Sequence, residues 1–182
     1  MRKELEVSAV SIHAYPEIAE NYALMNCGAS MGEGYGPMIV AKQGVSEEEA
    51  KSSPIAVPGL KTSAYLGIRL CWGDLQYEVV PFDEIIPRIL DDTYKSGLII
   101  HEGQLTYVDH DLNVLANLGI WWNEKTGGLP MPLGGNVVRR DLGQKMMEDI
   151  TMYTKMSIEH SIANPDTALE FAKKWGRGID DD

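Results

Sequence analysis

Short apolar runs alternate along the chain with longer stretches in which apolar residues recur at helical spacing. Runs of three to six residues, many of them β-branched, are typical of buried strands. They predict strands at 7–12, 22–25, 37–41, 55–57, 77–80, 98–100, 114–116 and 136–138. Capping residues predict helices starting at about 46, 62, 83, 141 and 164, with a further short helix at 121–122. This alternation favours an α/β fold with a largely parallel sheet covered on both faces.

One apolar run ends in an ionisable pair. Residues 98–100 are followed by His101 and Glu102, and then by Gly103, which lets the backbone turn sharply. His101 is therefore expected at the carboxyl end of a strand, where ligands bind in open α/β sheets and where a histidine can transfer protons near neutral pH. The alternative is a core histidine hydrogen-bonded to a neighbouring strand.

Two loops carry polar groups suited to ligand binding. The segment PGLKTSAY, residues 58–65, joins a predicted strand to a predicted helix, so its hydroxyl and unpaired N–H groups favour a carboxylate or phosphate at the positive helix end. The alternative is that Thr62 or Ser63 only caps the helix. The segment LPMPLGGN, residues 129–136, is predicted to be an extended loop in which Asn136 could orient a polar ligand.

A basic pair follows that loop. Arg139 and Arg140 could bind an anion, and pairing with acidic neighbours in solvent is the alternative. Asp141 comes next and is predicted to cap the longest helix.

Composition excludes several classes of protein. With 182 residues, of which 44% are apolar and 24% charged, the chain suits one domain or two small lobes. No run approaches the ~20 apolar residues of a membrane span, and the first ten residues contain no apolar leader, so we expect a cytoplasmic protein without a membrane partner. The net charge of −11 with scattered basic residues argues against nucleic acid.

The histidines and cysteines show no metal-ligand spacing. There is no HExxH or CxxC motif, so we expect no bound metal, with Cys27 and Cys71 reduced and structural. His13 ends the first predicted strand and is a weaker candidate than His101. His110 and His160 lie in polar or amphipathic helical contexts and are expected to be exposed.

Several of these stretches resemble one family. The chain is similar throughout, in one collinear order, to the 1,4-dihydroxy-6-naphthoate synthases of menaquinone biosynthesis. The segments that carry this resemblance are SAVSIHAYP, GASMGEGYGPMIVA, IAVPGLKTSAYL, VPFDEI, GLIIHEGQLTY, LGIWWNEKTG and LPMPLGGNVVRRDLG.

The resemblance implies a two-lobed fold similar to type 2 periplasmic binding proteins, with the ligand in the cleft between the lobes. It implies a cofactor-free lyase that converts cyclic de-hypoxanthine futalosine, a small anionic substrate, to 1,4-dihydroxy-6-naphthoate. The histidine of the family's IIHE motif, its proposed base, falls on His101. The family's cleft hydroxyl and amide pair falls on Ser63 and Ala64, with Thr62 adjacent, and its serine on the early strand falls on Ser11.

The chain also departs from the family pattern. Family members carry an earlier SPCPND-like strand and helix and continue past GRGID, so we expect an incomplete first lobe. That lobe and its hinge are assigned to about residues 1–55 and 165–182, and the second lobe to about residues 56–164. Two alternatives stay open: a non-catalytic small-molecule-binding protein and an inactive truncated homologue. A homodimer also stays open.

Overall fold

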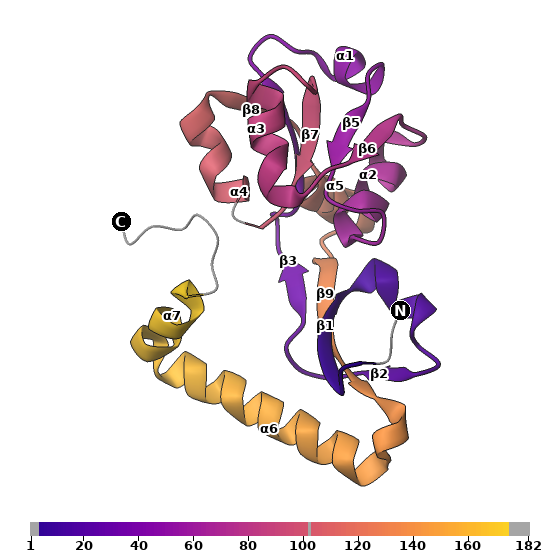
Figure 1. Cartoon of the computed structure of the whole chain (residues 1–182), viewed down its shortest axis with the longest axis vertical. Coiled ribbons are helices and arrows are strands. Elements are labelled where there is room, and N and C mark those ends of the chain that lie inside the picture. Colours follow the sequence, from indigo (N-terminus) through magenta and orange to yellow (C-terminus); the bar gives the residue numbers. More distant parts are fainter. Residues whose placement is uncertain (1–3, 102, 175–182) are drawn as a thin grey trace. The chain divides into compact units, whose positions relative to one another are not determined.

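The computed structural model describes residues 4–101 and 103–174, and the chain divides into two compact units (Figure 1). Unit 1 comprises residues 1–30 and 134–182, and unit 2 comprises residues 31–133. These boundaries differ from the lobes expected near residues 55 and 164, because the segment 38–42 pairs with strands of unit 2 and the longest helix belongs to unit 1.

Unit 2 is built on a five-stranded sheet of order β6-β5-β7-β4-β8. Its strands are β4 (Met38–Lys42), β5 (Ile55–Val57), β6 (Tyr77–Val79), β7 (Ser96–Ile99) and β8 (Leu112–Asn117). Strand β5 runs parallel to β6 and β7, whereas β4 is antiparallel to both β7 and β8. Strands β5, β6, β7 and β8 therefore run in the same direction, and β4 runs against them. The expectation of a largely parallel sheet holds for unit 2 except at β4, since an apolar run predicts burial of a strand and not its direction.

Helices cover both faces of this sheet, as the pattern predicted (Figure 1). The helices of unit 2 are α1 (Glu47–Lys51), α2 (Ser63–Trp72), α3 (Ile85–Leu90), α4 (Gly103–Thr106) and α5 (Leu118–Thr126), with 3-10 turns η2 (Phe82–Glu84) and η3 (Tyr107–His110). Consecutive strand residues point to opposite faces. Ile39 thus packs with Ile68 of α2 and Leu118 of α5, whereas Val40 packs with Ile85 of α3.

Helix caps explain where three of these helices begin. Ser46 accepts the N–H of Glu49 at 3.2 Å, which confirms the predicted cap of α1. Asn117 accepts the N–H groups of Gly119 and Ile120 at the start of α5. Thr62 caps α2 in the same way. Asp83, in contrast, lies inside η2 and does not cap α3, because the chain makes a 3-10 turn before the helix.

Unit 1 contains a smaller sheet, in which β9 (Met131–Arg139), most of which lies in this unit, is antiparallel to β1 (Val7–Ser11) on one side and to β2 (Tyr22–Leu24) on the other. Strand β3 (Ser30–Gly32) also pairs with β9. The helices of unit 1 are α6 (Gln144–Ala163) and α7 (Pro165–Lys173), with 3-10 turns η1 (Ile12–Glu17) and η4 (Arg140–Leu142). The loop expected at 129–136 is largely part of β9, because its backbone bonds to β1 as far back as Gly134. Asp141 lies in η4, so the cap predicted for α6 is wrong.

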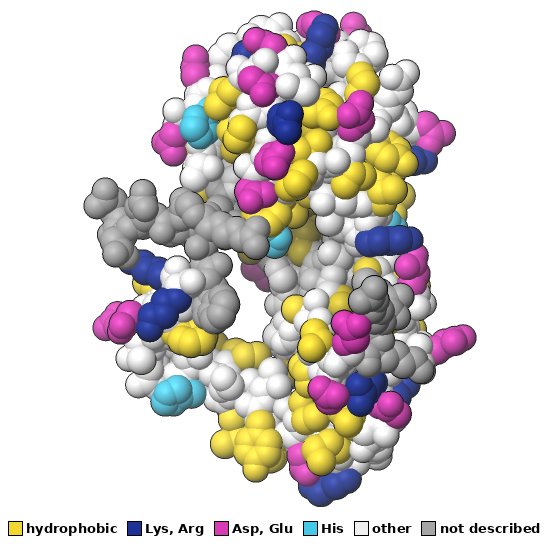
Figure 2. Space-filling view, in the orientation of Figure 1, with side chains coloured by type: hydrophobic (Ala, Val, Ile, Leu, Met, Phe, Trp, Pro, Cys, Tyr) yellow, Lys and Arg dark blue, Asp and Glu magenta, His cyan; other side chains and the backbone are white. Residues whose placement is uncertain are grey.

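Helix α6 presents apolar side chains to its surroundings. None of its described residues is buried, and its exposed hydrophobic residues are Met146, Met152, Tyr153, Met156 and Ile162. Figure 2 shows hydrophobic side chains along α6 and α7 in the lower part of the view. Within the described ranges, no helix combines the length and the apolar character needed to cross a bilayer.

Candidate functional site

The carboxyl ends of three parallel strands meet at one edge of the unit 2 sheet. Strand β5 leads into α2, β7 leads to His101, and β6 leads to Phe82. Strand β8 also ends at this edge, because Asn117 pairs with Met38, the residue that faces Ile99 in β7. The topology therefore brings the start of α2 and His101, two candidates from distant parts of the sequence, to the same edge.

The start of α2 is held by its own hydroxyl groups. The Thr62 hydroxyl donates to Gly59 O at 2.8 Å and accepts the Tyr65 N–H at 3.1 Å. Thr62 is therefore a helix cap, as the alternative interpretation of this segment expected. Ser63 is buried and donates to Leu133 O at 2.6 Å. The Ala64 side chain is also buried, in the core under the helix. The N–H groups of Ser63 and Ala64 belong to the first turn, where a helix supplies no acceptor of its own.

His101 is exposed, which contradicts the core-histidine alternative. It has a left-handed backbone with φ of 53°, whereas Gly103 is not among the residues with positive φ. The sharp turn expected at the glycine is thus made by the histidine. Non-glycine residues in this region carry strain and cluster at functional sites. Glu102 lies outside the described residues.

The imidazole of His101 packs against an aromatic ring, that of Phe82. The ring centroids of Phe82 and His101 lie 5.3 Å apart with an interplanar angle of 68°, which is an edge-to-face contact. Gln104 donates its backbone N–H to His101 O at 3.1 Å. Neither Phe82 nor Gln104 was predicted from the sequence as a site residue; the available signal for Phe82 was that it follows a predicted strand, as His101 does.

The remaining predicted binding residues belong to unit 1. Ser11 ends β1, is half-buried, and makes no cap hydrogen bond to η1. Asn136 pairs with Ala9 in the sheet, and its side chain lies under Gly28, where an added Cβ would overlap the amide. The roles of Ser11 and Asn136 in ligand binding stay predictions.

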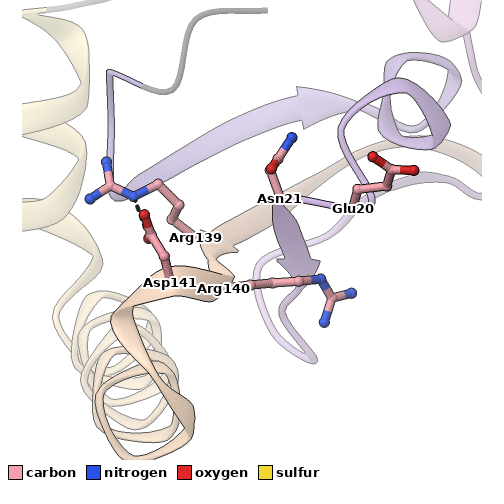
Figure 3. Close-up of a pocket in the computed structure, with 5 residues that line it drawn as sticks. All are labelled: Glu20, Asn21, Arg139, Arg140 and Asp141. Atoms are coloured by element: carbon pink, nitrogen blue, oxygen red, sulfur yellow. Dashed lines mark hydrogen bonds and ion pairs between the residues drawn. The ribbon is translucent and has the colours of Figure 1, made fainter.

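The arginine pair of unit 1 has acidic neighbours (Figure 3). Arg139 pairs with Asp141 at 2.6 Å and with Glu6 at 3.2 Å, and the bond to Asp141 raises the pKa of Arg139 above its ordinary value. Arg140 donates from Nε to Ala19 O at 2.9 Å. The pocket beside them has a volume of about 290 Å³ and includes Glu20 and Asp141 as well as both arginines. The pairing predicted for Arg139 is confirmed, and this balanced lining does not favour an anion.

Other expectations concern side chains outside the sheet edge. His110 and His160 are exposed, and both cysteines are free, as predicted. The described residues include no cluster of three or more metal-binding side chains. On the face shown in Figure 2, basic side chains are dispersed among acidic ones.

A family model described as menaquinone biosynthesis matches residues 1–181. The chain belongs to this family. The resemblance noted in the sequence is thereby confirmed. Two relatives named 1,4-dihydroxy-6-naphtoate synthase agree with it: the Thermus thermophilus protein is 32% identical over 178 residues, and the Streptomyces coelicolor protein is 31% identical over 185 residues. Each comparison covers 98% of this chain and 64% of the relative, so the chain spans just under two thirds of the length of these relatives.

Solved structures place the menaquinone-biosynthesis chain in a wider fold class. Protein AF1704 from Archaeoglobus fulgidus superposes with a TM-score of 0.90 at 44% identity, over 97% of this chain and 66% of that protein. A mutant of ArgBP from T. maritima gives a TM-score of 0.58 at 11% identity over 94% of this chain and 69% of its own. The ligand-binding component of a Staphylococcus aureus ABC-type importer gives 0.55 at 13% identity, over 76% of this chain and 49% of its own. These distant similarities confirm a mixed α/β fold like that of type 2 periplasmic binding proteins.

Proposed function

We propose that this chain carries the reaction centre of a 1,4-dihydroxy-6-naphthoate synthase, a cofactor-free lyase acting on cyclic de-hypoxanthine futalosine. The observation that carries the proposal is the exposed, left-handed His101 at the carboxyl edge of the unit 2 sheet. A histidine at such an edge is accessible to a ligand, and its backbone strain is the kind that functional sites retain.

His101 acts as the base in this proposal. Ring opening and aromatisation of the substrate need a proton removed from a carbon next to a carbonyl-type centre, and an imidazole nitrogen accepts that proton. Gln104 bonds to the main chain of His101 and not to its imidazole ring. This contact therefore does not occupy the ring nitrogen that accepts the proton.

The start of α2 binds the substrate carboxylate. Thr62 and Ser63 already donate their hydroxyl protons to Gly59 O and Leu133 O, so the first-turn N–H of Ala64 is the donor in this proposal. The helix end adds a favourable potential for a negative charge. Ser11, a candidate in unit 1, keeps the substrate-binding role that the family resemblance implies, and Asn136 keeps the role of orienting a polar ligand that its loop suggested.

The test is product formation measured by mass spectrometry. Purified chain is incubated with cyclic de-hypoxanthine futalosine, alongside His101→Asn and the matched control His110→Gln. Asparagine tolerates left-handed backbone but cannot accept a proton at neutral pH, so His101→Asn separates chemistry from folding. We expect a rate loss of about 100-fold or more for His101→Asn, on the scale of general-base catalysis, and an unchanged rate for His110→Gln.

Two outcomes would contradict the proposal. Turnover by His101→Asn at the wild-type rate would exclude His101 as the base. Binding of the substrate by the wild-type chain without any product, measured by titration calorimetry, would instead support the alternative of a non-catalytic binding protein.

A further inference from the structure

The strained backbone of His101 is supported by a glutamine. Gln104 donates its N–H to His101 O at 3.1 Å. In the amide orientation that satisfies both partners, its side chain accepts the His101 N–H at 3.2 Å and donates to Gly36 O at 2.7 Å. A left-handed conformation of a non-glycine residue costs about 1 kcal/mol or more and persists only where the surroundings hold it. Gln104 therefore fixes the backbone of His101, but it does not fix the imidazole ring.

The ring is held by Phe82. The centroid separation of 5.3 Å and angle of 68° fall within the geometry of attractive aromatic pairs, which contribute about 0.5–1.5 kcal/mol. Within residues 4–101 and 103–174, no hydrogen bond reaches a ring nitrogen of His101. The aromatic contact is thus the interaction that restricts the ring in the described part of the chain.

Phe82 is itself placed rigidly. It lies in η2 between two buried core residues, Val80 and Ile85. The Val80 N–H donates to Val57 O at 2.9 Å, and the Glu84 N–H donates to Pro81 O at 2.9 Å. The turn that carries Phe82 is therefore bonded to β5 on one side, through Val80, and packed into the core on the other, through Ile85.

We propose that Phe82 is a positioning residue for His101, holding the imidazole plane by edge-to-face packing while leaving both ring nitrogens available. A phenyl ring has no conventional hydrogen-bonding atom, so it orients the imidazole without occupying a nitrogen. Histidine bases are commonly oriented by a carboxylate or carbonyl, and here an aromatic ring does this instead. The catalytic part of the proposal rests on the proposed function of His101 as the base.

The experiment compares Phe82→Leu and Phe82→Tyr with Phe171→Leu, which removes the other phenylalanine of the chain, on the exposed surface of α7. The first readout is the NMR chemical shift of the His101 ring protons, assigned with His101→Asn. The second readout is kcat and KM for the conversion of cyclic de-hypoxanthine futalosine. Urea denaturation confirms that each variant is folded.

We expect Phe82→Leu to change the His101 ring shifts and to lower kcat by about 10- to 100-fold with KM within about twofold, because misplacing a catalytic group costs rate more than binding. Phe82→Tyr should restore both readouts, and Phe171→Leu should change neither. Unchanged ring shifts in Phe82→Leu would overturn the positioning role, as would changed shifts with an unchanged kcat. If the wild-type chain forms no product, the proposed function fails, and the ring shifts alone decide whether Phe82 holds the imidazole.

Discussion

The close approach of α5 to the segment before β4 makes Gly119 the most sensitive glycine of unit 2. A Cβ added there would overlap the carbonyl group of Tyr35 and lie against Gly36 N, all backbone atoms that cannot rotate away. Overpacking typically costs 1–3 kcal/mol, whereas alanine in place of glycine gains at most about 1 kcal/mol in a helix. We therefore expect Gly119→Ala to lower the free energy of unfolding by about 1–2 kcal/mol.

Two other helical glycines give matched controls. A Cβ at Gly67 would lie 2.7 Å from Met131 Cε and 3.2 Å from Leu118 Cδ1, and the flexible end of a methionine can move aside. Gly67→Ala should therefore be close to wild type. A Cβ at Gly103 would meet nothing nearer than 3.5 Å, so Gly103→Ala should be equal to or slightly above wild type.

The assay is urea denaturation followed by tryptophan fluorescence and circular dichroism, with the free energies of unfolding extrapolated to water. Coincident transitions by the two probes justify a two-state analysis. A Gly119→Ala protein as stable as Gly67→Ala would refute the reasoning, because it would show that the backbone yields as easily as a side-chain end.

The same structure predicts one stability effect and one pH effect. Thr62→Val should lower the free energy of unfolding, measured by urea denaturation, by about 1 kcal/mol because the cap of α2 is lost. Thr62→Ser keeps the hydroxyl and should lose much less stability. Equal losses in the two variants would contradict the capping role. Burial raises the pKa of the Cys71 thiol above its ordinary 9.0. The rate of Cys71 alkylation, measured by peptide mass spectrometry, should therefore reach half of its plateau only above pH 9.0. A midpoint below pH 9.0 would contradict the raised pKa. Because the folded pKa is raised, this thiol contributes stability that is present below about pH 9 and is lost as the pH rises through the folded value.

Most individual elements could be predicted from local sequence. The apolar run at residues 55–57 forms a fully buried strand, and the capping patterns at Ser46 and Thr62 start helices as expected. These features depend on neighbours within a few residues, so the sequence contains the information needed. The predicted caps at Asp83 and Asp141 were wrong because 3-10 turns intervene. The strand predicted at 136–138 is longer, because pairing with β1 continues back to Gly134.

The candidate site could be predicted only in part from the local sequence. Sequence placed His101 after a strand and Thr62 before a helix, and the family resemblance gave both a role. Tertiary structure decided that β5 and β7 are parallel neighbours, which brings these residues to one sheet edge, and that His101 is exposed with a left-handed backbone.

The contact between Phe82 and His101 could not be predicted from the sequence. Phe82 precedes His101 by nineteen positions and belongs to another strand connection, so no local pattern links the two rings. Hydrophobic periodicity determined which residues are buried and which elements form, because burial acts on each segment separately. Strand direction, the side chains that meet at the sheet edge, and the ring that faces His101 were decided by pairing between distant segments, which only the folded chain specifies.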